Sequence, residues 1–210
     1  MEFIKKIIHY IFNGFFNTTI PTLFATMKFR YYCKQLVLGK KIMILGRMQL
    51  QISKLSRISI GNKVMFINKT KFNFIGIHSK STLAVLDNAI LRIGDNTGFS
   101  GVSIYCSKFI SIGTNCAIGA NACIWDTDFH QIDYLDRRYN KNEIKSKDIN
   151  IGNDVFIGAY TIILKGVTIG DRSVVAAGSV VTKSIPSDEV WGGNPAKFIK
   201  KMYYSTNTNQ

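Results

Sequence analysis

Histidine, cysteine and proline are scarce in this chain of 210 residues, which contains 3, 4 and 3 of them. The histidines, His9, His78 and His130, lie far apart and form no HxH, HExxH or mixed Cys/His spacing, so we expect no metal site. No two cysteines form a CxxC pair and no clear secretory signal precedes them, which favours reduced thiols in a cytosolic protein over a disulfide framework. The cysteines are Cys33, Cys106, Cys116 and Cys123.

Acidic residues are scarce as well, because 13 Asp and Glu face 27 Lys and Arg, which gives a net charge of +14. Such an excess predicts attraction to something anionic: nucleic acid, a membrane surface or a phosphorylated ligand. The lysines are dispersed and accompany no basic and aromatic motif, so we expect no nucleic-acid partner. The 46% of hydrophobic residues excludes a disordered chain, and the length fits one domain.

The chain also lacks an uninterrupted hydrophobic run long enough to cross a membrane. Residues 1–41 contain an amphipathic helical segment, because apolar residues recur there in pairs every four positions. His9, Asn13 and Asn17 interrupt the stripe, whereas a membrane span needs about 20 mostly apolar residues, and no small-residue cleavage site follows. The stripe consists of Phe3, Ile4, Ile7, Ile8, Ile11, Phe12, Phe15 and Phe16.

Two interpretations of this helical segment stay open. It lies on an anionic membrane surface, with Lys5 and Lys6 toward the lipid headgroups, or it packs on the domain or on a neighbouring subunit. Under either interpretation we expect a cytoplasmic protein, and under the first one it is peripheral on the inner face of the membrane.

From about residue 42 the helical period gives way to a period of six. Aliphatic residues, often followed by glycine, recur every six positions without a slip in residues 112–124 and again in residues 151–181. A strand alone has a period of two and a helix one of 3.6, so the period of six predicts short strands joined by tight corners in a coil. The repeating pairs are Ile93-Gly94, Phe99-Ser100, Ile112-Gly113, Ile118-Gly119, Ile124-Trp125, Ile151-Gly152, Ile157-Gly158, Ile163-Leu164, Ile169-Gly170, Val175-Ala176 and Val181-Thr182.

A second position in each repeat, four residues after the aliphatic, is small or β-branched, which predicts that it also points inward. These residues are Cys116, Ala122, Val155, Thr161, Val167, Ser173 and Ser179. Glycine and asparagine recur between them, where we expect corners that need a positive φ. The corner residues are Gly113, Asn115, Gly119, Asn121, Gly152, Asn153 and Gly170.

This pattern divides the chain into three parts. We expect the helical segment at residues 1–41, the coil at residues 42–186, and a C-terminal loop and tail with a short helical segment at residues 187–210. One interruption of the repeat, residues 125–150, is predicted to be a loop that leaves the coil.

Three stretches of the repeat region resemble the hexapeptide-repeat acyltransferases, in the branch that contains maltose, galactoside and capsular-polysaccharide O-acetyltransferases. They are residues 151–170 (IGNDVFIGAYTIILKGVTIG), 177–183 (AGSVVTK) and 193–197 (GNPAK). The resemblance covers about residues 58–200 and implies an all-β, left-handed parallel β-helix. It also implies a homotrimer with active sites between subunits and acetyl-CoA as cosubstrate.

The interruption contains His130 two residues after Asp128, in the sequence DTDFH. From the residues alone, a histidine flanked by carboxylates is either a general base or an ordinary polar loop residue. The resemblance implies the former, because family members place their catalytic histidine in a loop at the corresponding point. Asp126 and Asp128 are then candidates for orienting the imidazole or for binding acceptor hydroxyls.

The resemblance also carries positions for coenzyme A onto this chain. Small residues that let the pantetheine pass close to the backbone would be Ala159 and Ala177, with Thr182 and Lys183 beside them, and the basic side chains near the phosphates would be Lys197 and Lys200. A backbone N–H near Gly158 and Ala159 is the candidate oxyanion donor.

The predicted function is therefore O-acetylation of a saccharide hydroxyl, on a surface-polysaccharide unit or its precursor, by general-base catalysis. The alternative within the same class is N-acetylation of an amino sugar or a nucleotide-linked amino sugar. A γ-type carbonic anhydrase shares the implied fold, but it needs three metal-binding histidines around an interface, and this chain has too few in suitable places.

Overall fold

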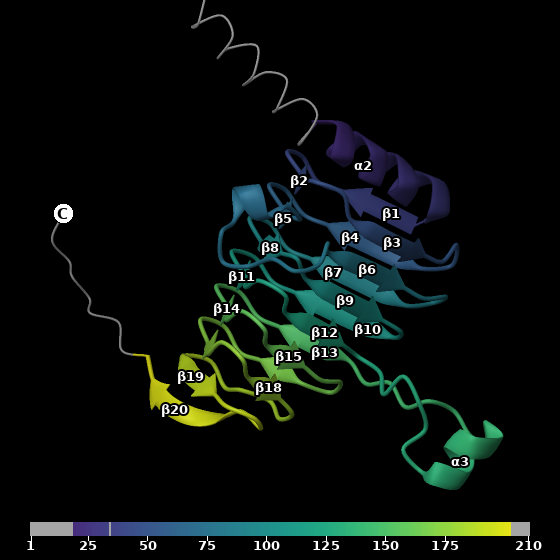
Figure 1. The fold of residues 1–210 in the computed structure, drawn as a ribbon, viewed down its shortest axis with the longest axis vertical. Helices are drawn as coiled ribbons and strands as arrows, with labels where there is room; N and C mark the ends of the chain where they lie inside the picture. The colour runs from purple at the N-terminus through teal and green to yellow at the C-terminus, as the bar shows by residue number, and fades with distance from the viewer. Residues whose placement is uncertain (1–18, 34, 203–210) are drawn as a thin grey trace, which may run out of the picture.

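The computed structural model describes residues 19–33 and 35–202, and in that part of the chain the backbone winds into a parallel β-helix. Strands of successive turns pair in parallel and form three sheets, here called A, B and C, which follow one another in each turn (Figure 1). This architecture confirms the coil predicted from the six-residue period. The predicted amphipathic stripe at residues 3–16 lies outside the described residues.

Sheet A opens each turn of the coil. It has six strands: β1 (Gln35–Leu38), β4 (Arg57–Ile60), β7 (Ile90–Ile93), β10 (Phe109–Ile112), β13 (Ile149–Ile151) and β16 (Thr168–Ile169). Because β1 pairs with β4 from Gln35 onward, the coil begins at residue 35 and not at residue 42 as predicted.

Sheets B and C complete each turn. Sheet B has eight strands: β2 (Met43–Leu45), β5 (Met65–Ile67), β8 (Gly98–Ser100), β11 (Ala117–Ile118), β14 (Phe156–Ile157), β17 (Val174–Val175), β19 (Glu189–Gly192) and β20 (Lys197–Lys201). Sheet C has six: β3 (Gln49–Ile52), β6 (Thr82–Val85), β9 (Ser103–Cys106), β12 (Cys123–Trp125), β15 (Ile162–Ile163) and β18 (Val180–Val181).

The core is a set of columns in which equivalent side chains of successive turns stack on one another. In sheet A, for example, Ile112 pairs with Ile151, and Ile151 pairs with Ile169. The small residues predicted to point inward are all buried, with exposed fractions of 0% to 2%. Parallel pairing satisfies each backbone against the turn above and below, so the hexad sequence specifies both the strands and their register.

Glycine is needed at the corners mainly because a Cβ there would lie too close to the backbone of the next turn, and less because of the backbone conformation. A Cβ on Gly113 would lie 2.4 Å from the carbonyl oxygen of Gly152, and a Cβ on Gly158 would lie 2.3 Å from the backbone nitrogen of Ala177. The prediction of a positive φ is therefore wrong for Gly113, Gly119, Gly152 and Gly170, although it holds for Asn115 and Asn121. In the next corner the positive φ falls on Asp154 and not on Asn153.

Helix α2 (Ile20–Tyr32) covers the N-terminal end of the coil (Figure 1). Its Ala25 and Phe29 are buried in the core, and the hydroxyl of Thr22 accepts a hydrogen bond from the backbone N–H of Ile44 at 2.9 Å. Its other face leaves Leu23 and Tyr31 exposed. Among the described residues no helix has the length and apolar character that crossing a bilayer requires.

Two segments leave the coil, not the single one predicted. The first, residues 68–81, contains the 3-10 helix η2 (Thr70–Phe72), and the second, residues 126–148, contains helix α3 (Tyr134–Tyr139). The first folds back on the coil, because the carbonyl of Gly76 accepts hydrogen bonds from the amide of Asn121 at 2.8 Å and from the hydroxyl of Tyr160 at 3.1 Å. We call these segments the first and the second excursion.

The short helical segment expected after residue 186 is absent from the described residues, where a β-hairpin takes its place. Strand β19 pairs in parallel with β17 and antiparallel with β20, so it extends sheet B. Trp191 packs against the core, and its indole N–H donates to Glu189 at 2.7 Å. The consecutive Gly192 and Gly193 disfavour a helix, whereas the flanking β-branched and aromatic residues favour strands.

The glycine contacts predict a difference between two alanine variants. We expect Gly113→Ala to lower the free energy of unfolding by about 2–3 kcal/mol, because the new methyl group meets backbone that cannot move without breaking the stack. The control is Gly98→Ala, since nothing lies within 4 Å of a Cβ at that position, and we expect a change below about 0.5 kcal/mol. Urea unfolding followed by circular dichroism measures both, and equal stabilities would contradict the close-contact explanation.

Candidate active site

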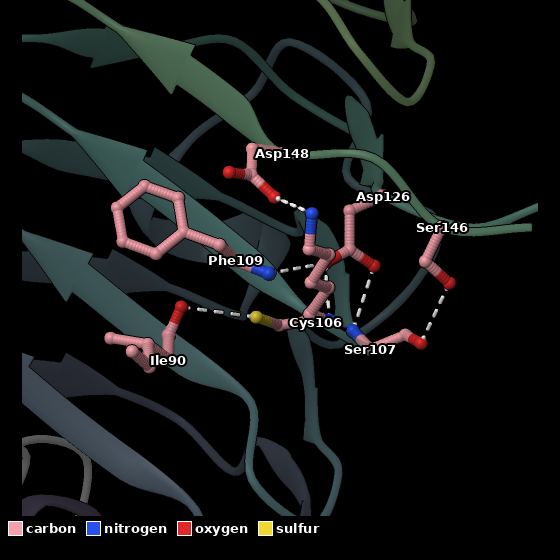
Figure 2. Close-up of polar contacts among 8 residues, drawn as sticks. Ile90, Cys106, Ser107, Phe109, Asp126, Ser146 and Asp148 are labelled. Carbon is pink, nitrogen blue, oxygen red and sulfur yellow. Dashed lines mark hydrogen bonds and ion pairs between the residues drawn. The ribbon is translucent and has the colours of Figure 1, made fainter.

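The second excursion starts at Asp126, directly after β12, and the carboxylate of this residue is fully buried. It accepts three backbone N–H groups of the preceding corner, from Ser107 and Lys108 at 2.7 Å each and from Phe109 at 2.9 Å (Figure 2). Burial raises the pKa of Asp126, and the three hydrogen bonds act in the opposite direction. Asp126 is sealed from solvent and its described contacts are with the corner, whereas none of them is with His130. Its predicted role in orienting the imidazole or binding an acceptor stays a prediction.

The returning end of the excursion is fastened to the same corner. The hydroxyls of Ser107 and Ser146 lie 3.0 Å apart, and Lys108 forms an ion pair with Asp148 at 2.8 Å (Figure 2). Thr127 and Ser146 form an antiparallel bridge between the outgoing and returning backbones. The neck of the excursion is thus a short ladder, and its tip with α3 projects away from the coil (Figure 1).

An aromatic contact anchors the backbone immediately before His130. The ring of Phe129 lies edge-on to Tyr105, with centroids 4.8 Å apart, and to Trp125, with centroids 5.4 Å apart. Phe129 has a φ of 62°, which turns the chain so that its own ring meets sheet C while His130 is exposed. Sequence reasoning missed this anchor, although the hexad register places Trp125 next to Tyr105 on the outer face of sheet C.

Asp128 forms an ion pair with Lys165, whose side chain extends from the corner that follows β15. Both side chains are largely buried, with exposed fractions of 18% for Asp128 and 21% for Lys165. Lys165 was not among the predicted site residues. The register could have found it, because Ile124 pairs with Ile163, which puts residue 165 below the corner where the excursion begins.

The predicted site residues fall on two edges of sheet C within one protomer. His130, Asp128, Thr182 and Lys183 all follow the carboxyl ends of β12 and β18, so they lie along one edge, with Lys165 between them. Thr182 and Lys183 are exposed there.

The opposite edge of sheet C carries the small residues. Ala159 precedes β15 and Ala177 precedes β18, and the carbonyl of Ala159 accepts the N–H of Gly178 at 2.8 Å, which stacks the two corners. The N–H of Gly158 is occupied, because it donates to Val175 at 2.7 Å. The N–H of Ala159 has no acceptor in the described part of the chain, so of the two candidate oxyanion donors only this one is without a partner there.

The C-terminal hairpin adds the remaining predicted residues to this second edge. Its turn is held against β18, because Val180 donates to Gly193 at 2.9 Å and Ala196 donates to Val180 at 2.8 Å. Lys197 and Lys200 follow on β20, where both side chains are exposed. Ala159 and Lys165 are six residues apart along an extended segment, so the two edges are separated by up to about 20 Å.

None of the cysteines is placed for covalent catalysis. Cys33, Cys106 and Cys116 are buried and Cys123 is half-buried, and all four are free thiols. Burial raises the pKa of Cys106, of Cys116 and of Cys123, which disfavours the nucleophilic thiolate.

Comparison with known proteins identifies the repeat. Residues 148–183 match the family model for bacterial transferase hexapeptide (six repeats), and residues 109–124 match that for the hexapeptide repeat of succinyl-transferase. The galactoside O-acetyltransferase of Escherichia coli (strain K12) is 41% identical over 93 residues, which make up 44% of this chain and 44% of that protein.

Two solved structures share both fold and sequence similarity with this chain. A hexapeptide-repeat acetyltransferase of Vibrio cholerae, complexed with acetyl-CoA, has a TM-score of 0.57 and 26% identity, over 86% of this chain and 76% of that chain. The polySia-specific acetyltransferase NeuO has a TM-score of 0.51 and 26% identity, over 85% of this chain and 86% of that chain.

The coil of three parallel sheets, with its hexad core and its excursion after β12, defines a left-handed parallel β-helix of the hexapeptide-repeat class. The chain is similar to hexapeptide-repeat acetyltransferases, and residues 109–124 and 148–183 match models of that repeat. Its matched region spans only 44% to 63% of the length of the curated relatives.

The structural role of Asp126 predicts a stability effect. We expect Asp126→Asn to lower the free energy of unfolding by about 1–3 kcal/mol, because an amide turns one N–H₂ group toward backbone donors and leaves a buried donor unsatisfied. The matched control is Asp148→Asn, which removes an exposed ion pair and is expected to change stability by less than about 1 kcal/mol. Thermal unfolding at neutral pH compares the two, and an equal effect would argue against the corner-supporting role.

Proposed function

We propose that this protein transfers the acetyl group of acetyl-CoA to a hydroxyl of a saccharide, with His130 as the general base. The observation that carries the proposal is the placement of His130, an exposed imidazole directly after a residue anchored to sheet C by two aromatic contacts. Acetyl-CoA and a saccharide can reach such an exposed side chain, while the anchored backbone limits the positions that the imidazole can take.

In the proposed reaction His130 takes the proton of the acceptor hydroxyl while that oxygen attacks the thioester carbonyl carbon. The tetrahedral intermediate collapses as the carbon–sulfur bond breaks, and the imidazolium returns the proton to the departing thiolate. The acetyl group passes directly to the acceptor, which is consistent with the burial of the cysteine thiols.

The free N–H of Ala159 is the proposed donor to the negative oxygen of that intermediate. Its carbonyl and the neighbouring Gly158 are fixed in the ladder, so the N–H is held in place before the reaction begins. A hydrogen-bond donor that is already in position stabilises the developing negative charge without having to reorient. This preorganisation accounts for most of the effect of such donors on the reaction rate.

Asp128 and Lys165 have a positioning role in this proposal. Their ion pair links the excursion to the turn of the coil below it, two residues before His130. The carboxylate of Asp128 is paired with Lys165, so we propose that the ion pair acts near the imidazole, and not a free carboxylate.

A complete site is proposed to form between copies of the chain. His130 and the N–H of Ala159 lie on opposite edges of sheet C, so in this proposal they belong to two different sites of the assembly. A cyclic trimer would bring one edge of each protomer against the other edge of its neighbour, which makes three equivalent sites. The exposed Lys183, Lys197 and Lys200, together with Thr182 and Ala177, would then line the course of coenzyme A.

A saccharide acceptor is supported by the relatives and by the surroundings of His130. The relatives are named for a galactoside and for polySia, and a surface-polysaccharide unit or its precursor fits both. The half-exposed rings of Tyr105, Trp125 and Phe129 provide an apolar face next to the imidazole, on which a sugar ring can pack. An amino sugar is the competing acceptor. Acetylation of its amine would form an amide, whereas acetylation of a hydroxyl forms an ester.

The general-base role predicts the effect of removing the imidazole. We expect His130→Ala to lower kcat by about a thousandfold while the affinity for acetyl-CoA is retained, because proton transfer is lost and the donor contacts are not. The control is His78→Ala, which removes the only other described histidine, located in the first excursion.

The measurement is release of the CoA thiol with a panel of neutral and amino sugars. Treatment of the product with hydroxylamine separates the two acceptor classes, since it cleaves an ester and leaves an amide intact. Full activity of His130→Ala would exclude the proposed base, and a hydroxylamine-resistant product would replace the hydroxyl acceptor by an amine.

The shared site predicts complementation between two inactive variants. We expect His130→Ala and Ala159→Glu to be inactive alone, and their co-refolded equal mixture to recover about a quarter of the wild-type activity, because one interface in each mixed trimer has both intact halves. Size-exclusion chromatography with light scattering checks the assembly of each variant. An inactive mixture of well-assembled trimers would mean that both groups act within one protomer's site or not at all.

A further inference from the structure

The described part of the chain has a hollow between helix α2 and the first two turns of the coil, and His130 is not among its lining residues. Its volume is about 610 Å³, within the range of small-molecule sites. Ile20, Pro21 and Phe24 of α2 form one wall, and Met48 and Leu50 of the first turn form another. The apolar walls would accommodate a hydrocarbon chain or a similar group.

Four basic residues line the same cavity: Lys28, Arg47, Lys69 and Lys80. No acidic residue is among its lining residues. The surrounding sequence is also exclusively basic among its charged residues, because residues 3–86 contain 14 Lys and Arg and no Asp or Glu. The cavity therefore lies in the part of the chain that carries the excess positive charge.

One residue that lines the cavity has a buried polar atom without a partner among the described residues. Asn68 lines the cavity and is 6% exposed, and its side-chain oxygen accepts the backbone N–H of Ser81 at 2.8 Å, which closes the neck of the first excursion. Its Nδ2 is buried and has no hydrogen-bond partner in the described part of the chain. An unsatisfied buried donor is unfavourable, so a ligand that accepts a hydrogen bond there would remove a penalty.

The first excursion fixes these groups around the cavity. The aliphatic stem of Lys69 lies across Gly46, where an added Cβ would meet its Cγ at 2.7 Å. Lys80 is held at the other end of the neck, next to Ser81. A second hollow of about 360 Å³ shares Asn68, Lys69 and Lys80 with the first, so the basic groups line both.

We propose that this cavity binds the phosphate group of an amphiphile, with the apolar chain of that molecule against α2 and the first turn. A phosphate ester offers several acceptor oxygens, which suits a set of four cations and one unpaired amide donor better than a single acceptor would. The exposed apolar residues of α2 include Phe24, which lines the cavity, and also Leu23 and Met27, as expected where a ligand is taken from a lipid phase. The inference does not rest on the proposed acetyl transfer.

The test is isothermal titration calorimetry of the full chain with octyl phosphate below its micellar concentration. We expect one site per chain, binding of inorganic phosphate weaker by about tenfold or more because it lacks the apolar chain, and no binding of octyl glucoside. Binding is expected to weaken with added salt, because the cations are partly exposed to solvent. Equal affinity for octyl glucoside would overturn the anion site, and equal affinity for inorganic phosphate would overturn its amphiphilic character.

The decisive variant is Asn68→Asp, which keeps the oxygen that Ser81 requires and replaces the unpaired donor by a negative oxygen. We expect it to lower the affinity for octyl phosphate by about tenfold or more. The double variant Arg47→Ala with Lys80→Ala gives the same loss by removing two cations, and it carries the test if Asn68→Asp does not fold. The matched control is Lys54→Ala, an exposed lysine of the same turn of the coil outside the cavity, which is expected to bind as the wild type does.

Two further comparisons distinguish binding in the cavity from binding at the acetyl-CoA site and from binding to the basic surface as a whole. Saturating acetyl-CoA is expected to leave the affinity for octyl phosphate unchanged, and displacement would assign the cavity to the donor and overturn the proposal. Co-sedimentation with vesicles of phosphatidic acid is expected to fall in Asn68→Asp and to be kept in Lys54→Ala. Equal losses in both variants would show attraction of the whole basic surface to an anionic membrane, which would replace the cavity as the binding site.

Discussion

The close contact of successive turns at their corners is the constraint on which the rest of this structure depends. Glycine at positions such as Gly113 and Gly158 lets backbone meet backbone at distances that a side chain would prevent. With the corners in contact, each strand pairs with the strand below it in fixed register, and aliphatic side chains stack in columns. The position of every exposed group on the coil follows from that register, including the edge from which His130 projects.

The coil of short strands could be predicted from the sequence because the aliphatic residues recur every six positions, whereas its left-handedness was implied only by the family resemblance. The small inward residues, such as Thr161 and Ser179, were predictable for the same reason. The first excursion was not, because its end at Ser81 is fixed by the side chain of Asn68 and not by a repeat motif. The C-terminal hairpin was also missed, since its pairing with β17 depends on an edge that only the assembled sheet provides.

The candidate site was predicted less completely than the fold. His130 could be singled out because the chain has few histidines, but nothing in the sequence separates the role of Asp126 from that of Asp128. Asp126 contacts three backbone N–H groups of a corner 17 to 19 residues away, and Asp128 contacts a lysine 37 residues away. These partners are brought close by the pairing of strands from different turns, and a motif of a few consecutive residues carries no information about that pairing.

The neck of the second excursion has a consequence for how proteins of this kind diversify. Both ends of the excursion are fastened to one corner of the coil, by the bridge between Thr127 and Ser146 and by the bonds to Ser107 and Lys108. The tip beyond this neck makes no contribution to the stacked core, so insertions, deletions and exchanges of residues there leave the scaffold intact. Selection can therefore change the exposed surface of the tip while His130 at its root keeps its place.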